Sequence, residues 1–314
     1  MARLTEDANG VYVIALTPFT ETGALDLDST DRMIDFYLER GATGLTVLGM
    51  MGEAQKLTID ESQTYVRRIL KRVDGKVPVV AGVSSAGFAS MKALTDMVMD
   101  DGAAGVMIAP PASLRNDQQI VTYYQQAADF IGDTPFVLQD FPLVTSVTIP
   151  VSVIQTIIDQ IPTCVCLKHE DWPGLGKISA LRRQAEKPGS RRISILCGNG
   201  GVFLPEEMAR GADGAMTGFA YPEMMRDVVR YSREGNPDRA QDLFDAYLPL
   251  ARYEQQPGLG LAIRKFIMAK RGAIASPALR KPGGSLSKDD IAEIERLIAR
   301  QIRRLDQLGV SLDR

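Results

Sequence analysis

The sequence has 314 residues, of which 45% are hydrophobic and 24% charged, and its formal net charge is −3 at pH 7. This composition predicts an ordinary globular protein with a sizeable buried core and argues against disorder. The slightly acidic balance, together with the lack of a long basic block, argues against nucleic acid as a partner.

The N-terminus and the cysteines indicate in which cellular compartment the protein is expected. The first ten residues lack the apolar core of a signal peptide, and the longest uncharged run is short and contains Pro150, so no membrane span is expected. Three cysteines and one histidine form neither a complete disulfide framework nor a typical histidine metal site. We therefore expect a reduced, cytoplasmic protein without a structural metal.

Eight short apolar segments are expected to be strands. They have the continuous Val, Ile and Leu character of strands buried on both faces, as a parallel sheet requires. In chain order they cover 11–19, 44–49, 77–83, 105–111, 135–141, 163–170, 193–199 and 214–220.

The stretches between these strands predict amphipathic helices, because apolar residues recur there at three- and four-residue spacing. Eight strand–helix units in succession favour an α/β fold of the (β/α)₈ barrel type. The first strand lacks the G-x-G-x-x-G turn of a dinucleotide fold, which argues against an open doubly wound sheet. After about residue 235 only helical segments follow, so we expect a barrel over 1–235 that carries the active site and a helical extension over 236–314.

In such barrels the active site lies at the C-terminal ends of the strands. Lys168 stands near the end of the sixth strand, where alternation places Cys164, Cys166 and Glu170 on its face and His169 on the other. If that face is the interior, a partly desolvated ammonium has a lowered pKa and can attack a carbonyl as a neutral amine. The alternative is a lysine that only marks the exit of the strand into solvent. We interpret the two cysteines as core packing.

Three other strand ends attract attention. The second ends in 49–58, a glycine-bracketed turn that leads into a helix starting near Thr58 and would suit a carboxylate, or form a tight loop with Glu53 as a local hydrogen-bond acceptor. The fifth places Gln139 on the opposite face from Asp140. The seventh ends in 197–201, where glycines allow close approach of a ligand.

Taken in order, the G-x-x-G-E turn after strand two, the proline-terminated strand five, the lysine on strand six and the G-N turn after strand seven resemble the dihydrodipicolinate synthase/N-acetylneuraminate lyase superfamily. The resemblance covers nearly the whole chain. It implies a class I aldolase mechanism, in which Lys168 forms an imine with the 2-oxo group of pyruvate or a related acid, without a metal or organic cofactor. It also implies a homo-oligomer, either a tetramer or a dimer.

The sequence departs from the synthases at positions that matter. Met50 and Met51 stand where members commonly have two threonines that bind the substrate carboxylate and relay protons. Gln139 replaces a proton-shuttling tyrosine, Val144 stands where an arginine is expected, and the tyrosine usual after strand four falls within 110–114. The residues that make a synthase are thus largely absent.

The remaining motifs, Q-D-x-P, K-x-E and G-A-M-T-G-x-x-Y-P, are similar to those of the 2-keto-3-deoxy sugar acid dehydratases, such as the L-arabonate type. In that case Glu170, or a water held by Gln139, would move the C3 proton as the C4 hydroxyl leaves. Glu170 could equally be the charge partner that positions Lys168. The candidate catalytic residues are Lys168, Gln139 and Glu170, and the candidate substrate-binding residues are Gly49, Met50, Met51, Gly198 and Met216.

We therefore expect a lyase that acts on a small 2-oxo acid, either a 2-keto-3-deoxy sugar acid dehydratase or an aldolase. One alternative is a dihydrodipicolinate synthase that condenses pyruvate with aspartate semialdehyde. A hypothesis of another class is a retired enzyme that binds a 2-oxo acid without turnover, which the lost hydroxyl groups suggest.

Overall fold

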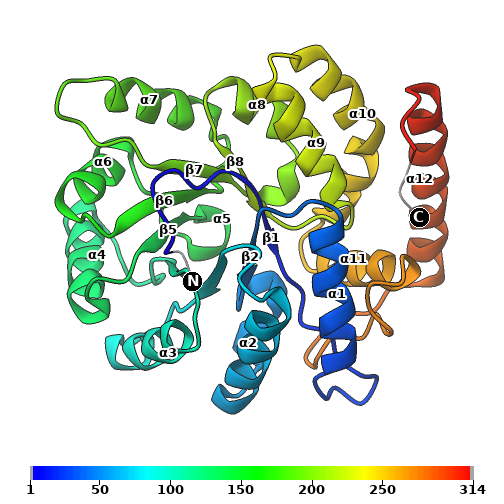
Figure 1. Cartoon of the computed structure of the whole chain (residues 1–314), viewed down its shortest axis with the longest axis horizontal. Helices are drawn as coiled ribbons and strands as arrows, with labels where there is room; N and C mark the ends of the chain where they lie inside the picture. Colours follow the sequence, from blue (N-terminus) through cyan, green and yellow to red (C-terminus); the bar gives the residue numbers. More distant parts are fainter. Residues whose placement is uncertain (1–2, 312–314) are drawn as a thin grey trace.

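The computed structural model describes residues 3–311. Eight parallel strands close into a barrel, in which each strand pairs with the next and β8 pairs with β1 (Figure 1). This confirms the predicted (β/α)₈ barrel. Each strand overlaps its predicted segment and is shorter, and β1 begins one residue before it. The strands are β1 (Gly10–Ile14), β2 (Gly44–Val47), β3 (Val79–Gly82), β4 (Gly105–Ile108), β5 (Phe136–Asp140), β6 (Cys164–His169), β7 (Ser194–Cys197) and β8 (Gly214–Thr217).

Helices surround the barrel and connect successive strands. They are α1 (Leu27–Glu39), α2 (Ile59–Val73), α3 (Phe88–Asp100), α4 (Asp117–Ile131), α5 (Pro142–Thr145), α6 (Val151–Gln160), α7 (Leu175–Ala185), α8 (Leu204–Ala209) and α9 (Pro222–Arg233). Three short 3₁₀ turns follow strand ends: η1 (Met50–Gly52), η2 (Ala54–Lys56) and η3 (Asn199–Gly201).

The start of α2 illustrates how the local sequence sets these helices. The Thr58 side chain accepts from the backbone N–H of Glu61, whose carboxylate accepts from the Thr58 N–H in return. This capping box satisfies two of the N–H groups that a helix start leaves without partners. The apolar stripe that follows, from Tyr65 to Val73, packs its buried side chains against the barrel.

Apolar side chains form two separate cores. On β1, Val11 and Val13 join the larger core between the strands and the helices, while Tyr12 and Ile14 join the core inside the barrel. Alternation along a strand explains this division. Two N-terminal residues, Leu4 and Ala8, also belong to the inner core.

One expectation about β6 was wrong. Cys164 does not share the face of Lys168, because it belongs to the outer core, whereas Cys166 belongs to the inner one. The β5–β6 register shifts between Phe136 and Val137, so Cys164 and Cys166 face consecutive residues of β5. The extra residue in β6 reverses the alternation below Cys166. All three cysteines are unpaired and buried, as core packing predicts.

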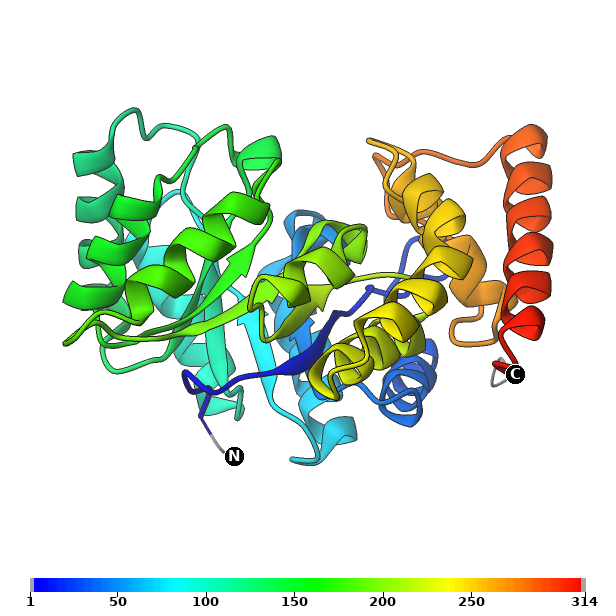
Figure 2. The same cartoon turned by 90° about the horizontal axis from the view of Figure 1, so that it is seen from above.

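The C-terminal segment is helical, as expected, and consists of α10 (Pro237–Glu254), α11 (Gly260–Lys270) and α12 (Lys288–Gln307). α10 packs against both α9 and α12, and the three helices lie together at one side of the barrel (Figures 1 and 2). Ser287 caps α12 through a capping box. The division of the chain at residue 235 stays a prediction.

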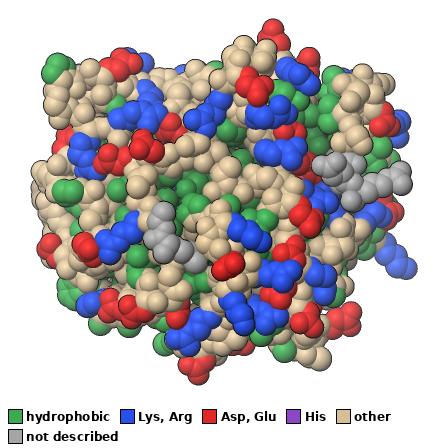
Figure 3. All heavy atoms as spheres, viewed as in Figure 1, with side chains coloured by type: hydrophobic (Ala, Val, Ile, Leu, Met, Phe, Trp, Pro, Cys, Tyr) green, Lys and Arg blue, Asp and Glu red, His purple; other side chains and the backbone are tan. Residues whose placement is uncertain are grey.

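The surface carries charges of both signs. On the face drawn in Figure 3, acidic and basic side chains are interspersed over the helices. Among residues 3–311, none of the helices is both long and apolar enough to span a membrane.

Candidate active site

A cavity of about 430 Å³ opens at the C-terminal ends of the barrel strands. It is lined by side chains that follow or end β5, β6, β7 and β8, and on another side by the segment from Glu254 to Arg264. Five of the residues predicted from the sequence meet in its wall: Met50, Met51, Gln139, Lys168 and Glu170. Barrels of this type carry their active sites at this end, so the cavity is the candidate site.

Lys168, Glu170 and Gln139 are directly connected. Lys168 Nζ lies 3.0 Å from Glu170 Oε2, and each of these two side chains is only 7% exposed. Gln139 Nε2 donates to the same Glu170 oxygen at 2.7 Å. Gln139 and Lys168 are paired in the β5–β6 register, so the sheet itself places the amide beside the ammonium. Lys168 is therefore a buried cavity residue, and the strand-exit interpretation does not hold.

The turn after β7 makes room for Glu170. A Cβ atom on Gly198 would lie 2.1 Å from Glu170 Cγ, so any larger residue there would displace the carboxylate. The next residue, Asn199, donates from Nδ2 to the Glu170 carbonyl oxygen at 3.0 Å. The glycine at this strand end therefore leaves the space that the Glu170 side chain occupies. Gly198 itself does not line the cavity.

A second part of the cavity wall is apolar. Met50 and Met51 line it from η1, and Phe141, Leu143 and Val144 line it from the end of β5 and from α5. Leu143 and Val144 are 64% and 53% exposed, respectively, so they lie where the cavity meets solvent. At positions 50, 51 and 144 the synthase pattern has polar side chains. In this protein these positions are the hydrophobic residues Met50, Met51 and Val144.

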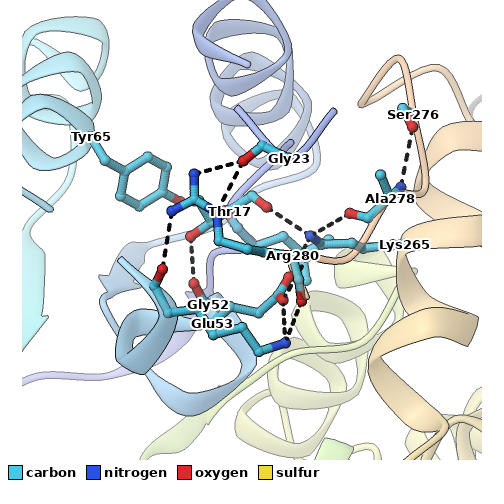
Figure 4. A network of polar contacts seen from close by, with 11 residues as sticks. Thr17, Gly23, Gly52, Glu53, Tyr65, Lys265, Ser276, Ala278 and Arg280 are labelled. Carbon is cyan, nitrogen blue, oxygen red and sulfur yellow. Dashed lines mark hydrogen bonds and ion pairs between the residues drawn. The ribbon is translucent and has the colours of Figure 1, made fainter. Parts of the chain in front are cut away.

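The loop that carries Met50 and Met51 is fixed by a buried polar network (Figure 4). Glu53 Oε1 accepts from Lys265 Nζ at 2.6 Å, and Glu53 Oε2 accepts from the Arg280 backbone N–H at 3.1 Å. Burial lowers the pKa of Lys265, and its hydrogen bond with Glu53 opposes that shift. Glu53 is an acceptor, as predicted, but its partners include the distant C-terminal segment.

The same network reaches the loop after β1. Lys265 Nζ also donates to the carbonyl oxygens of Thr17 and Ala278, at 2.8 and 2.9 Å. The Thr17 hydroxyl in turn donates to the Gly52 carbonyl oxygen at 2.5 Å. The backbone of the 49–53 turn is therefore held from two directions.

Another buried ion pair lies where the C-terminal segment meets the cavity. Arg264 Nε donates to Glu254 Oε1 at 2.5 Å, and Glu254 Oε2 accepts from the Ala220 N–H at 3.3 Å. Burial raises the pKa of Glu254, and Arg264 opposes that shift. Arg264 also donates from Nη2 to the Gly218 carbonyl oxygen, just beyond β8.

The remaining predicted residues take other places. Gly49 precedes η1 and Met216 is fully buried in the inner core, and neither lines the cavity. Their role in substrate binding, like that of Gly198, stays a prediction. His169 lies on the outer face, as expected, with Nδ1 3.8 Å from Asp140 Oδ2, while Lys177 Nζ pairs with that carboxylate at 2.7 Å. Over residues 3–311, no group of three His, Cys, Asp or Glu side chains could hold a metal ion.

Reasoning from the sequence missed the residues that the C-terminal segment brings to the cavity. Glu254, Gln255 and Arg264 all line it, although they belong to the helical extension rather than to the barrel strands. The charged residues in the otherwise apolar face of α11 were a usable signal, because a buried charge needs a partner.

The fold and the site together define a (β/α)₈-barrel protein with a buried lysine–glutamate pair in a cavity at the C-terminal ends of its strands. The model of the dihydrodipicolinate synthetase family matches residues 7–301, and the chain belongs to this family, whose members are lyases.

Individual relatives carry different names. L-2-keto-3-deoxyarabonate dehydratase of Azospirillum brasilense is 31% identical over 303 residues, which cover 95% of each chain. A solved structure described as dihydrodipicolinate synthase from Rhodopseudomonas palustris is 51% identical, with a TM-score of 0.94, and the match covers 96% of this chain and 100% of that one. The 4-hydroxy-tetrahydrodipicolinate synthase of Thiobacillus denitrificans is 28% identical, over 77% of this chain and 80% of its own length.

Proposed function

We propose that the protein is a cofactor-independent lyase that forms an imine between Lys168 and a 2-oxo acid, and that its reaction is the dehydration of a 2-keto-3-deoxy sugar acid. The observation that carries the proposal is the buried contact between Lys168 Nζ and Glu170 Oε2, 3.0 Å long, in the wall of the cavity. A nucleophile beside a carboxylate that can take its proton is what imine chemistry requires.

The chemistry follows from this contact. The Lys168 amine attacks the C2 carbonyl, and loss of water gives a protonated imine that withdraws electrons from C3. Glu170 then removes a proton from C3 to form an enamine, and the C4 hydroxyl leaves as water after it is protonated. Hydrolysis of the imine releases the product and restores the amine. Gln139 cannot titrate, so in this scheme it orients the Glu170 carboxylate through their 2.7 Å hydrogen bond.

Support for dehydration comes from two sides. The relative from Azospirillum that covers 95% of the chain is named a dehydratase of this type. The cavity offers Met50, Met51 and Val144 where a synthase would use two hydroxyl groups and an arginine. An aldol cleavage between C3 and C4 would start from the same imine, so the leaving group distinguishes the two reactions.

A second candidate is the condensation of pyruvate with aspartate semialdehyde. It is favoured by the 51% identical structure from Rhodopseudomonas palustris, which is described as a dihydrodipicolinate synthase. This reaction needs a binding group for the second carboxylate, and the apolar side chains of Leu143 and Val144 at the cavity entrance offer none.

The test is trapping with borohydride. The purified protein is incubated with pyruvate, and separately with 2-keto-3-deoxy acids of five and six carbons, then reduced and examined by intact-mass and peptide mass spectrometry. We expect a single adduct on Lys168, its absence in Lys168→Ala, and an unchanged adduct in the matched variant Lys187→Ala, whose lysine is exposed on the surface. Turnover is followed by loss of the substrate and by the mass of the product, 18 Da lower for dehydration.

The outcomes separate the hypotheses. No adduct with any acid on the folded protein would refute the proposal. An adduct without turnover of any acid would support the retired, 2-oxo-acid-binding protein instead. Faster turnover of pyruvate with aspartate semialdehyde than of any 2-keto-3-deoxy acid would favour the synthase.

A further inference from the structure

A polar side chain in the cavity wall, that of Gln255, is open to a ligand. Gln255 follows directly after α10, lines the cavity and is partly exposed. Within residues 3–311 its amide makes no hydrogen bond, and the buried polar atoms without a partner all belong to other residues. The amide oxygen and nitrogen of Gln255 therefore both remain accessible. The unpaired Nη1 atom of Arg264 differs, because it is buried.

The turn after β7 supports this amide. A Cβ atom on Gly200 would lie 1.8 Å from Gln255 Nε2, so the amide rests directly on the backbone of the turn. Gly200 has a φ of +65°, and its N–H donates to the Thr217 hydroxyl at 2.8 Å. The backbone conformation and the close contact both favour glycine at this position. The surface under the amide is thus attached to the end of β8.

The chain that carries the amide is anchored as well. Glu254, the residue before Gln255, forms a buried ion pair with Arg264. A Cβ atom on Gly260 would lie 2.1 Å from the Glu254 carbonyl oxygen, so the start of α11 packs closely against the end of α10. The backbone at Gln255 is therefore held by both helices, and binding of a ligand by the amide would cost mainly the freedom of one side chain.

Glu170 and Gln255 border the same turn. The Glu170 side chain occupies the space beside Gly198, and the Gln255 amide occupies the space beside Gly200, two residues further on. Between them, Asn199 donates to the Glu170 carbonyl oxygen at 3.0 Å. All three of the side chains involved line the cavity. A substrate whose C3 atom faces Glu170 would therefore extend its outer carbons along the part of the wall that Gln255 lines.

The chemistry of the amide indicates the group that it binds. A carboxamide both donates and accepts hydrogen bonds, as a hydroxyl group does, and neither group carries a charge. Among the described residues that line the cavity, the two cations, Lys168 and Arg264, already belong to ion pairs. A second anionic group on the substrate would meet no unpaired cation there, which is unfavourable in a site that is largely buried.

We propose that the Gln255 amide binds the terminal hydroxyl group of the substrate, and that it thereby selects 2-oxo acids with this group over those that end in a methyl group. The inference deepens the proposed function and rests on the imine at Lys168, because that bond fixes the other end of the substrate. Gln255 is in this case a specificity-determining residue, supplied by the helical extension rather than by a strand end.

The first test changes the substrate and leaves the protein intact. The concentration that gives half-maximal borohydride adduct on Lys168 is measured on the wild type for a 2-keto-3-deoxypentonate, for its 5-deoxy analogue and for pyruvate. Loss of one hydrogen bond between neutral groups should raise this concentration about 3- to 10-fold for the deoxy analogue. Equal values for the pentonate and its deoxy analogue would overturn the proposal.

The second test changes the protein. Gln255→Met keeps the length of the side chain but cannot donate a hydrogen bond, so we expect the pentonate and its deoxy analogue to be trapped at similar concentrations and pyruvate to be trapped as by the wild type. The matched control is Gln241→Met, also on α10, where the amide donates to Asp245 outside the cavity. This variant should keep the preference of the wild type.

The outcomes keep the two proposals apart. Full preference for the pentonate in a folded Gln255→Met variant, checked by circular dichroism, would contradict the role of Gln255. So would a weakening of pyruvate trapping as large as that for the pentonate, because the residue would then act on the end that both acids share. Trapping by the wild type without a preference for the terminal hydroxyl refutes only this role. Failure of the wild type to trap any acid refutes the imine at Lys168, and the inference with it.

Discussion

Lys265 Nζ and Glu53 Oε1 lie 2.6 Å apart, and the two residues are 0% and 1% exposed. They are separated by 212 positions in the sequence, one on α11 and the other at the end of the turn that carries Met50 and Met51. Because Glu53 also accepts from the Arg280 N–H, the C-terminal segment holds one wall of the cavity from behind (Figure 4). The extension is thus structurally coupled to the site.

Replacement of this lysine should destabilise the fold. Lys265→Met removes one partner of a buried pair and leaves Glu53 Oε1 without its ammonium, while Lys56 Nζ stays 2.7 Å from Oε2, so we expect a loss of up to about 3–5 kcal/mol of unfolding free energy. Urea unfolding measures the loss. The matched control is Lys270→Met on the same helix, where the lysine pairs with Glu295 on the surface and should contribute no more than about 1 kcal/mol. Equal stabilities for the two variants would contradict this prediction.

Glu170 can be tested separately from Lys168. If Glu170 transfers the C3 proton, Glu170→Gln should still form the reduced adduct on Lys168, although more slowly because no carboxylate takes the lysine proton, and turnover should fall further, by about 10²- to 10⁴-fold. The glutamine keeps the size of the side chain and can still contact Gln139. If Glu170 only positions Lys168, adduct formation and turnover should fall together.

Asp171→Asn provides the control for that experiment. Asp171 is the next residue along the chain, and its carboxylate pairs with Lys177 outside the cavity. We expect Asp171→Asn to keep both trapping and turnover close to those of the wild type. A similar loss in both variants would show that the charge of the loop matters, rather than proton transfer by Glu170.

Local signals in the sequence predicted most of the barrel and part of the site. The continuous apolar runs identified the strands, and the strand ends pointed to Lys168, Glu170 and Gln139, because residues near the ends of parallel strands meet at one edge. The error at Cys164 arose because counting by alternation assumes a regular pleat, and one extra residue in β6 reverses the faces. Such a bulge has no signature in the apolar pattern.

Local sequence patterns could not predict which residues the helical extension brings to the cavity. Arg264 and Lys265 are adjacent on α11, but one reaches Glu254 and the cavity, while the other reaches Glu53 behind η1. Which partner each charge finds depends on how α11 packs across the barrel mouth, and that packing joins segments more than two hundred residues apart. Periodicity within a helix carries no such information.

Assembly is a prediction that the family resemblance supplies. We expect a homotetramer or a homodimer, and light scattering of the purified protein at micromolar concentration measures the mass directly. A mass equal to one chain of 34.3 kDa would show that the expectation is wrong.

Glu207, a residue of α8 outside the cavity, should contribute to the pH dependence of the free energy of unfolding. Burial raises the pKa of this carboxyl from 4.5 to about 8, the neighbouring Glu206 adds to the shift, and a hydrogen bond with Cys197 opposes it. In the unfolded chain the carboxyl releases its proton near its usual pKa, whereas the folded protein keeps that proton up to about pH 8. The folded state therefore binds more protons in this window, and stability must fall as the pH rises through it.

Glu207→Gln removes this contribution, because an amide does not titrate. Between about pH 5 and 8 the free energy of unfolding of the wild type should fall by up to about 1.4 kcal/mol per pH unit more steeply than that of the variant. Melting temperatures at pH 5 and pH 8 measure the difference, with the exposed Glu234→Gln as a control that keeps the slope of the wild type. Parallel curves for the wild type and Glu207→Gln would contradict the prediction, because they would mean that the buried carboxyl is already ionised at pH 5.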